Sequence, residues 1–303
     1  MVFPKVTTVS VVIASWNGAK YIIETLDSIL NQSYPVCEII VVDDGSSDNT
    51  RDLVENYNPL VRLVAQPNAG RCAARNNGIM QAVGDALIIL DQDDLLLPNN
   101  VEVGVRMLNN NLHAAFSGGF SIGINENGDV TGDRFGSTGL CDYGTMLRGS
   151  MFVPPSVVMF RTKVLQEIGG FDTSFKRGGE DSDIYLRVAQ NYPVHCHDID
   201  VVAYRRHGEN GSNDAEAMLT TSLQFMEKQR KFVDRHPQYK GDWQVGRVHW
   251  CRLFGKNLVM QGVGVLKAGD VPRAVKIFIL SLRYHPKSFA NFAAFHLRRI
   301  LSG

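Results

Sequence analysis

Acidic side chains follow an apolar run in the segment ALIILDQDDLLLP, residues 86–98. Asp91, Asp93 and Asp94 stand where the apolar run ends, and apolar residues resume directly after them. Like charges gathered at the end of a buried strand are unfavourable unless a cation neutralises them. Two carboxylates one residue apart can reach one hard cation and its ligand, so Asp91 and Asp93 predict a site for Mg²⁺ or Mn²⁺ with a phosphate-bearing ligand. We interpret Asp94 as a residue that begins a turn.

A second acidic cluster, in the segment KRGGEDSDIYLRV, has two interpretations. Glu180, Asp181 and Asp183 follow two glycines and precede apolar residues at the helical period. Acids at the start of a helix are favoured by its exposed N–H groups and macrodipole. A carboxylate in the same place could also accept a proton during catalysis. The residues themselves leave both interpretations open.

The elements that must position these acids form an alternating pattern. Apolar runs rich in β-branched residues predict buried strands at 9–16, 37–46, 61–66 and 86–91. Helical periodicity predicts helices from residue 22 to about 34, over 47–57 with Ser47 or Asp48 as the cap, and over 70–83. Strands alternating with helices indicate an α/β protein with right-handed crossovers and a mostly parallel sheet.

Ligands of such sheets bind at the carboxyl ends of the strands. In this sequence those ends are all polar: residues 15–17, 43–46, 66–68 and 91–94. We therefore expect one rim of the sheet to bind the ligand and the cation.

The rest of the chain predicts less regular elements and then long helices. Residues 113–134 predict a hairpin outside the parallel core, residues 151–172 a strand and a short helix, and residues 197–205 a last strand. Helices are predicted over 215–236 and 243–270, and another starts at 270–272. The expected organisation is one half of an α/β domain over 1–100, a second half over 101–212 and a helical extension over 213–303.

Composition excludes several protein classes. The chain has 303 residues, 44% hydrophobic and 20% charged, which is typical of a folded globular protein rather than a disordered one. The start, MVFPKVTT, lacks the pattern of an export signal, and no apolar run approaches the ~20 residues that span a bilayer. We expect a cytoplasmic protein, and a peripheral position at the inner face of the membrane stays open. Five scattered cysteines without a CxxC pair are predicted to be reduced packing residues: Cys37, Cys72, Cys141, Cys196 and Cys251.

Positive charge is concentrated near the C-terminal end. Residues 242–303 contain ten Lys or Arg against two acids, although the net charge of the chain is zero. On the last predicted helix, basic residues share one face and apolar residues the opposite one: Arg273, Lys276 and Arg283 against Phe278 and Leu282, with Arg298 and Arg299 beside phenylalanines further on. Such a tail can lie on an anionic membrane surface, pack on the catalytic domain or form a homodimer, and these alternatives stay open.

Four segments together resemble family 2 of the nucleotide-sugar glycosyltransferases. They are VSVVIASWNGAKYIIETLDSILNQSYPVCEIIVVDDGSSDNT, NAGRCAARNNGI, LDQDD and GGFDTSFKRGGEDSDIYLRV, in this order, and the resemblance covers residues 9 to about 212. It implies a GT-A fold, a nucleotide-diphosphate sugar donor and inversion at the anomeric carbon. In such a fold, residues 1–100 are expected to form the nucleotide-sugar-binding half and residues 101–212 the acceptor-binding half. It also implies a Mn²⁺ or Mg²⁺ cofactor held by the DxD motif.

The resemblance assigns donor-binding and metal-binding roles to particular positions. Donor binding falls to Ala14, Ser15, Trp16, Asn17, Asp43, Arg75, Asp91, Gln92 and Arg205. Within this set, Asp43 accepts a hydrogen bond from the base, Arg75 contacts base or diphosphate and Arg205 pairs with a phosphate. Without the motif, Arg75 would be an ordinary surface arginine on a helix. Metal binding falls to Asp93 as direct ligand, to Asp91, and to His207, which a structural role would also explain.

The same resemblance assigns the general base to Asp181, with Glu180 as the alternative. A helix N-terminus lowers the pKa of a carboxylate, so we expect Asp181 to be ionised near neutral pH. The acceptor is expected to be a saccharide or a lipid-linked saccharide of cell-envelope polysaccharide biosynthesis, and no nucleic acid is expected. UDP is the expected nucleotide, with GDP and dTDP left open.

Two other functions remain open at this point. One is a protein of the same fold that binds a nucleotide sugar without turnover. The other is a phosphate-handling enzyme of another type, which is disfavoured because neither a P-loop nor a GxGxxG motif is present.

Overall fold

Four parallel strands form the first half of the sheet. In the computed structural model they are β1 (Val9–Ser15), β2 (Glu38–Asp43), β3 (Val61–Ala65) and β4 (Ala86–Asp91). β1 pairs with β2 and β4, and β2 pairs with β3, all in parallel. The register places Ser15 beside Asp43, and Ala14 beside Asp91, so these strands end at one rim. The predicted parallel sheet and its polar rim are confirmed.

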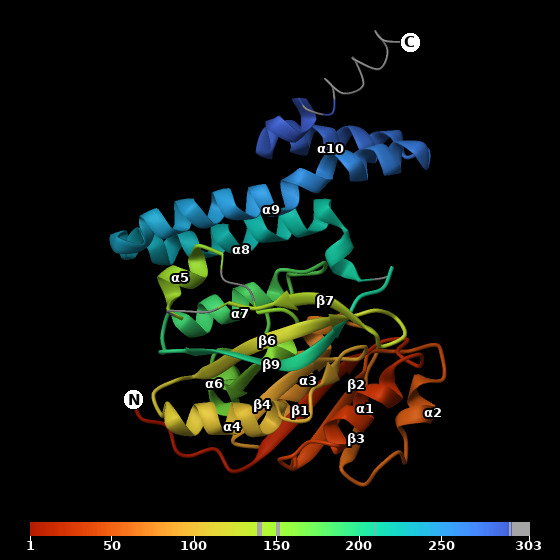
Figure 1. Cartoon of the computed structure of the whole chain (residues 1–303), viewed down its shortest axis with the longest axis vertical. Coiled ribbons are helices and arrows are strands. Elements are labelled where there is room, and N and C mark those ends of the chain that lie inside the picture. The colour runs from red at the N-terminus through yellow and green to blue at the C-terminus, as the bar shows by residue number, and fades with distance from the viewer. Residues whose placement is uncertain (138–140, 150–151, 209, 291, 293–303) are drawn as a thin grey trace. The chain divides into compact units, whose positions relative to one another are not determined.

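Three helices connect these strands. They are α1 (Ile22–Leu30), α2 (Thr50–Val54) and α3 (Arg71–Gln81), and Figure 1 shows them beside the red and orange strands. α2 is shorter than predicted, and its N-cap is Asn49 rather than Ser47 or Asp48. Asp48 instead accepts hydrogen bonds from the backbone N–H and the hydroxyl of Thr50, as a turn residue does.

The second half of the sheet is mixed. It contains β5 (Leu95–Leu96), β6 (Phe116–Ile124), β7 (Val130–Phe135), β8 (Val158–Arg161) and β9 (His195–Arg205). The strand order is β3-β2-β1-β4-β8-β6-β9-β5, and β7 pairs only with β6. β6 and β7 form the predicted hairpin, which lies outside the four parallel strands as expected. β6 is nevertheless an interior strand of the sheet, between β8 and β9. Eight of the nine residues of β6 are buried.

The remaining helices belong to two compact units of the structure. The first unit comprises Met1–Met146, Ser150–Lys176 and Glu180–His207. The second comprises Leu147–Gly149, Arg177–Gly179 and Gly208–Gly303. The structure describes residues 1–137, 141–149, 152–208, 210–290 and 292.

The first unit also contains α4 (Asn100–Asn110), α6 (Thr162–Glu167), α7 (Glu180–Ala189) and the 3₁₀ turn η1 (Pro155–Val157), and α5 (Tyr143–Leu147) ends at the boundary. The second contains α8 (Ala215–Arg235), α9 (Lys240–Lys267), α10 (Val271–Tyr284) and the 3₁₀ turns η2 (Gly211–Asn213) and η3 (Pro237–Tyr239).

The close packing of α3 on β1 depends on a glycine. A Cβ atom built on Gly78 would lie 2.3 Å from Cγ1 of the buried Val12. Only glycine allows this approach without displacing the strand. The same helix carries Arg75, whose side chain is 1% exposed. The close approach therefore brings a charged side chain under the rim of the sheet.

A disulfide joins Cys141 to Cys196, the second residue of β9. The prediction that all five cysteines are reduced was wrong for this pair. Their separation of 55 residues gives no sequence signal, because the pairing arises from the fold. Cys37, Cys72 and Cys251 are free thiols.

The second unit is built on three helices. Ala215, Leu219, Leu258 and Ile277 form its buried core, drawn from α8, α9 and α10. The Asp270 side chain caps α10 by accepting a hydrogen bond from the Arg273 N–H, as the predicted start at 270–272 implies. Within the described residues, no helix combines the length and the hydropathy that a bilayer crossing requires.

The predicted basic face of α10 is partly used inside this unit. Arg273 pairs with Asp214 and Glu216 at 3.1 and 3.0 Å, and Lys276 pairs with Glu216 at 2.9 Å. Two of the three basic side chains thus hold α10 to the start of α8. Arg298 and Arg299 lie outside the described residues.

Candidate active site

The loop after β1 is held by one side chain from the acidic motif. Gln92 accepts hydrogen bonds from the Ser15 hydroxyl and the Trp16 N–H through Oε1, at 2.8 and 2.9 Å. Its Nε2 donates to the Trp16 carbonyl at 3.2 Å. Gln92 thus connects the end of β4 to the end of β1, which places Ala14, Ser15 and Trp16 beside the DxD segment. The Trp16 side chain itself is largely exposed.

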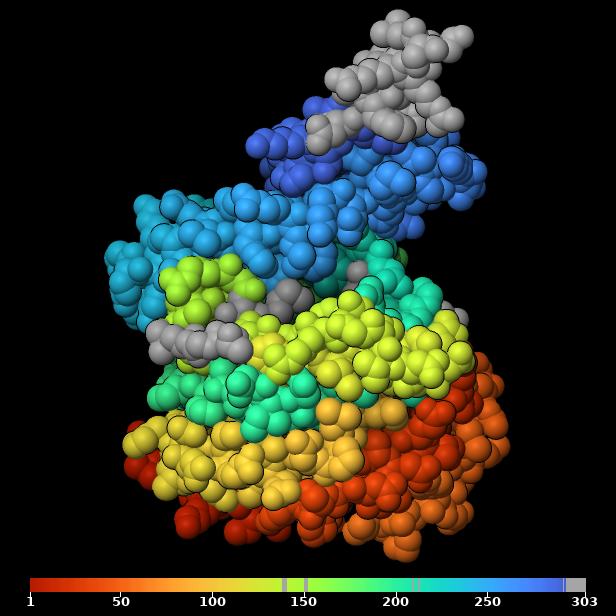
Figure 2. Space-filling model, viewed as in Figure 1, coloured from red at the N-terminus to blue at the C-terminus, as the bar shows by residue number. Residues whose placement is uncertain are grey.

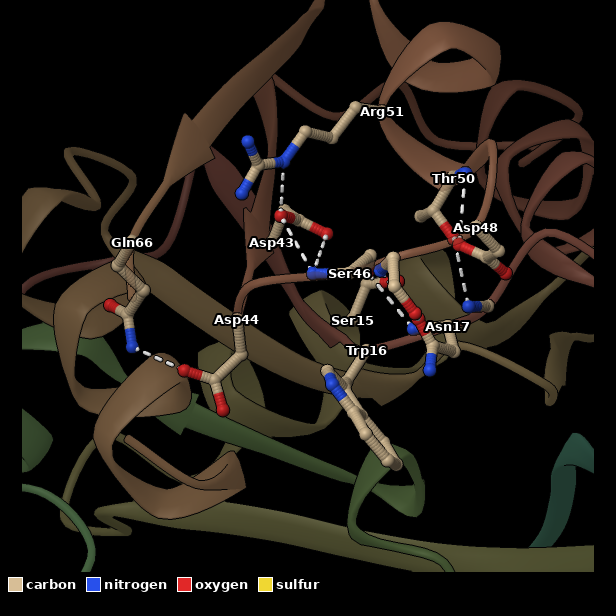
Figure 3. A network of polar contacts seen from close by, with 12 residues as sticks. Ser15, Trp16, Asn17, Asp43, Asp44, Ser46, Asp48, Thr50, Arg51 and Gln66 are labelled. Carbon is tan, nitrogen blue, oxygen red and sulfur yellow. Dashed lines mark hydrogen bonds and ion pairs between the residues drawn. The ribbon is translucent and has the colours of Figure 1, made fainter. Parts of the chain in front are cut away.

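The loop after β2 contains the network drawn in Figure 3. Asp43 is fully buried, accepts a hydrogen bond from the Ser46 N–H at 3.3 Å and pairs with Arg51 at 2.5 Å. Asn17 has a φ of 51° and accepts a hydrogen bond from the Ser47 N–H, so it joins this loop to the loop after β1. The predicted base-binding residues Asn17 and Asp43 therefore belong to one connected network.

Asp44 organises a third loop of the rim. It accepts hydrogen bonds from the Gln66 side chain, the Ala69 N–H and the Gly70 N–H, each at 2.8 Å. These donors follow β3 and precede α3. Asp44 therefore fixes the start of the helix that carries Arg75.

Arg75 contacts both acidic motifs. Its Nη2 lies 2.6 Å from Asp91 Oδ1, and its Nη1 lies 3.0 Å from Asp181 Oδ1 and 3.3 Å from Glu180 Oε1. The interpretation of Arg75 as an ordinary surface arginine is therefore wrong. The structure brings the DxD and Glu-Asp motifs together around one buried guanidinium, although they lie about ninety residues apart in the sequence.

The two residues of the Glu-Asp motif differ in exposure. Glu180 is 1% exposed and pairs with Arg71 at 2.6 Å as well as with Arg75. Asp181 is 28% exposed at the start of α7. Because a general base must reach the acceptor hydroxyl, Asp181 is the better placed of the two.

The pKa of Asp181 moves in the direction opposite to our prediction. Burial raises this pKa from its usual value to about 7, with further increases from the charges of Glu180 and Asp91, against the lowering by Arg75 and Arg71. The prediction considered only the helix N-terminus and missed desolvation and the two neighbouring carboxylates. The ionised form of Asp181 is therefore less favoured near neutral pH than its place at a helix N-terminus implies.

Asp93 and His207 form the second polar centre of the rim. His207 Nε2 lies 2.8 Å from Asp93 Oδ2, and both side chains are mostly buried. Burial and the charge of Asp91 raise the pKa of Asp93, whereas His207 lowers it. A carboxylate and an imidazole that face each other beside excess negative charge fit a divalent cation such as Mn²⁺.

The cation site is not complete from side chains alone. No group of three or more His, Cys, Asp or Glu within the described part of the chain is arranged to hold a metal ion. Mg²⁺ and similar ions commonly use one or two carboxylates and take further ligands from substrate phosphates. The residues present therefore fit a cation that binds together with a diphosphate.

Asp94 and Arg205 connect this centre to β9. Asp94 is fully buried and accepts a hydrogen bond from the Arg205 N–H at 2.8 Å. Burial and the charges of Asp93 and Asp91 raise the pKa of Asp94 well above its usual value. Arg205 is buried, and its guanidinium donates to the Asp93 carbonyl, to the Glu126 carbonyl and to Glu24. Because the Arg205 side chain is 1% exposed, a phosphate contact would require a movement that makes its guanidinium accessible.

Sequence reasoning did not identify three of these contacts. Arg51, Arg71 and Glu24 pair with Asp43, Glu180 and Arg205 respectively. Each lies on a helix at a position that is also typical of a solvent-exposed charge. The sequence gives no signal that distinguishes them, because their partners are brought close only by the fold.

Comparisons with known proteins all point to one family. Residues 10–169 match the family described as Glycosyl transferase family 2. An uncharacterized glycosyltransferase of Nostoc sp. is 27% identical over 82% of this chain and 80% of its own length. The chondroitin synthase of Escherichia coli is 30% identical over 69% of this chain and 30% of its own. The chain spans about a third of the length of the Rickettsia glycosyltransferases that it also matches.

Solved structures share the fold. A mannosyltransferase from Pyrobaculum calidifontis, in complex with GDP-Man and Mn²⁺, has a TM-score of 0.61 and 18% identity over 97% of this chain and 87% of that chain. A fragment of S. aureus TarS in complex with UDP-GlcNAc has a TM-score of 0.56 and 18% identity over 89% of this chain and 90% of that chain. These neighbours agree with the predicted GT-A fold and its helical C-terminus. With more than half of its residues matched and the motifs gathered at one rim, the chain belongs to glycosyl transferase family 2.

Proposed function

We propose that this protein is an inverting, metal-dependent glycosyltransferase that transfers a sugar from a nucleotide-diphosphate donor to a hydroxyl of a saccharide or lipid-linked acceptor. One observation carries the proposal: buried Arg75 contacts Asp91 of the DxD motif and Asp181 of the Glu-Asp motif at 2.6 and 3.0 Å. One side chain, that of Arg75, therefore contacts both the proposed donor-binding carboxylate and the proposed proton acceptor. This proximity is what a direct displacement at the anomeric carbon requires.

In this proposal, different residues of the rim bind different parts of the donor and the cation. The loops that carry Ala14 to Asn17 and Asp43 hold the base and ribose of the donor. Asp93 and His207, with Asp91, would hold Mn²⁺ or Mg²⁺, which neutralises the negative charge that develops on the leaving diphosphate. Arg205, buried beneath them, positions Asp93 through its backbone carbonyl.

Asp181 acts as the general base in this proposal. It accepts the proton of the acceptor hydroxyl as the hydroxyl oxygen bonds to the anomeric carbon and the bond to the diphosphate breaks. Arg75 keeps part of the Asp181 population ionised against the effects of burial, Glu180 and Asp91. Glu180 is the alternative base, although it is buried and paired with two arginines.

Substitution of the two acids tests these roles. Asp181→Asn is expected to abolish transfer and leave donor binding nearly intact, while Glu180→Gln keeps measurable transfer. Asp52→Asn removes one carboxylate from an exposed position on α2 and serves as the matched control. Loss of donor binding with residual turnover in Asp181→Asn would move the base elsewhere.

A binding protein without turnover is the second candidate, because many of the same contacts would hold a donor. Incubation of the purified protein with UDP-, GDP- and dTDP-sugars and Mn²⁺ separates the two candidates. Release of free sugar or nucleotide that stops on chelation of the ion supports the enzyme. Binding without release under any of these conditions supports the binding protein.

The nucleotide can be identified before any acceptor is known. A bound ligand raises the apparent stability of a protein according to its affinity and concentration. UDP, GDP and dTDP, each with Mn²⁺, are compared by the shift in thermal midpoint, and UDP is expected to give the largest shift. Equal shifts with and without the ion would contradict the proposed cation site.

A further inference from the structure

The second unit contains a basic groove on α9. Two adjoining hollows, of about 670 and 480 Å³, share the lining residues Gln244, Val248 and Arg252. We call their combined surface the α9 groove. The first hollow is also lined by residues at and after the end of α10, among them Arg283, Tyr284 and Lys287.

The charges of this groove have one sign. Arg247, Arg252, Arg283 and Lys287 line the first hollow, and no carboxylate lines it. None of the four has a carboxylate within ion-pair distance in the described part of the chain. Two of the guanidiniums lie over aromatic rings, Arg247 over Trp243 and Arg283 over Tyr284. Because the remaining walls are mostly apolar, the groove suits a ligand that carries both an anionic group and hydrocarbon.

The neighbouring helix α10 has an exposed apolar stripe. Val271, Val275, Ile279 and Leu282 recur at the helical period and are each about half exposed. The buried face of α10 is formed by other residues, Ala274, Ile277 and Ser281. Together with Val245, Val248, Met260 and Leu266 of α9, the stripe accounts for eight of the fifteen large exposed apolar side chains of the described residues. Figure 2 shows these helices in blue.

We propose that the α9 groove and the α10 stripe dock the protein on an anionic lipid surface. The groove binds the phosphate of an anionic phospholipid headgroup, and the stripe enters the interface between headgroups and acyl chains. Basic side chains attract anionic lipids, and an exposed apolar helix face gains free energy when it leaves water. This inference does not depend on the proposed transfer activity.

Sedimentation with vesicles tests the inference on the full chain. The protein is expected to bind vesicles of phosphatidylglycerol and to bind phosphatidylcholine vesicles much more weakly. Each basic side chain at such a surface contributes about 1 kcal/mol, or about fivefold in partitioning. Arg252→Gln combined with Lys287→Gln is therefore expected to lower partitioning into phosphatidylglycerol by about 25-fold. Both side chains are exposed, and neither has a cation–π or ion-pair contact in the described structure, so the fold should be unaffected.

Matched variants separate the two parts of the surface. Lys163→Gln with Lys231→Gln removes the same charge from exposed positions outside the groove and is expected to have little effect. Val275→Gln with Ile279→Gln is expected to lower partitioning by about tenfold or more, because two apolar side chains no longer enter the interface. Equal loss in the lysine control and the groove variant would overturn the role of the groove. Unchanged binding by the stripe variant would overturn the role of the stripe.

Further measurements distinguish a lipid surface from other occupants of the groove and the stripe. Displacement of the protein from vesicles by millimolar glycerol 3-phosphate would assign the groove to a soluble phosphate ligand and overturn the proposal. A wild-type dimer in light scattering that the groove or stripe variant converts to a monomer would assign the surface to a second copy. No binding of the wild type to phosphatidylglycerol at low salt would also overturn it.

Discussion

Replacement of Arg75 by glutamine removes the charge on which both acidic motifs depend. The guanidinium is 1% exposed and lies within 3.3 Å of three carboxylates, those of Asp91, Asp181 and Glu180. Breaking a buried ion pair from one side is destabilising by about 3–5 kcal/mol, because the remaining charge stays buried without compensation. That loss is a large fraction of the ~5–15 kcal/mol that typically separates folded and unfolded states.

The free energy of unfolding lost in Arg75→Gln should depend on pH in a defined direction. Arg75 lowers the pKa of Asp181, so its removal raises that pKa further above about 7. The unfolded chain has the ordinary aspartate pKa of about 4. A raised folded-state pKa means that the folded variant binds a proton that the unfolded chain has lost, so stability falls as pH rises. The wild type completes this fall near pH 7, whereas the variant continues to lose stability above it.

Urea unfolding followed by circular dichroism measures both effects. The difference in free energy of unfolding between wild type and Arg75→Gln is expected to reach about 3–5 kcal/mol near pH 9 and to be smaller near pH 6. Arg71→Gln is the matched control. Among the described residues its partly exposed guanidinium pairs only with Glu180, and this pair should contribute about 1 kcal/mol or less. A loss in Arg75→Gln no larger than in the control, or independent of pH, would refute the reasoning.

Three further outcomes are expected. The kcat/KM for transfer should rise with pH up to about pH 7 and then level off, because Asp181 must be ionised; a profile that falls over this interval would argue against the assignment. His207→Ala should weaken Mn²⁺ binding by about tenfold or more, measured by titration calorimetry with a nucleoside diphosphate present, and an unchanged affinity would leave Asp93 without a partner ligand. Gly78→Ala should lower thermal stability by about 1–3 kcal/mol through its clash with Val12, and Val12→Ala should partly restore it; a neutral Gly78→Ala would mean that α3 shifts freely.

The sequence predicted the strands of the rim because their signals are local. The apolar run that ends at Asp91 predicts a buried strand, and the Gly-Asp-rich segment after β2 predicts a turn. Each of these signals lies within a few residues. The pattern of residues 180–188 likewise predicted α7 and its acidic start. These features allowed the site to be placed at one edge of the sheet before the fold was known.

The remaining features depend on contacts between distant segments. The pKa of Asp181 could not be read from its helix position, because burial and the charges of Glu180 and Asp91 outweigh the helix N-terminus. The disulfide of Cys141 and Cys196 and the place of β6 inside the sheet have the same origin. Apart from Glu180, the partners that decide these features lie dozens of residues away along the chain.

Hydrogen bonds join Asp93 and Asp94 to residues at and after the end of β9. They determine when the proposed cation site can form during synthesis. Asp93 meets His207 across 114 residues of sequence, and Arg205 joins the same turn through its main-chain N–H and its guanidinium. During synthesis, the loops after β1 and β2 leave the ribosome well before these partners do. A nascent chain can therefore contain both loops before the proposed cation site can be completed, because the Asp93–His207 contact needs residues that follow β9. A truncation before His207 would retain the loops after β1 and β2 but remove the histidine that contacts Asp93.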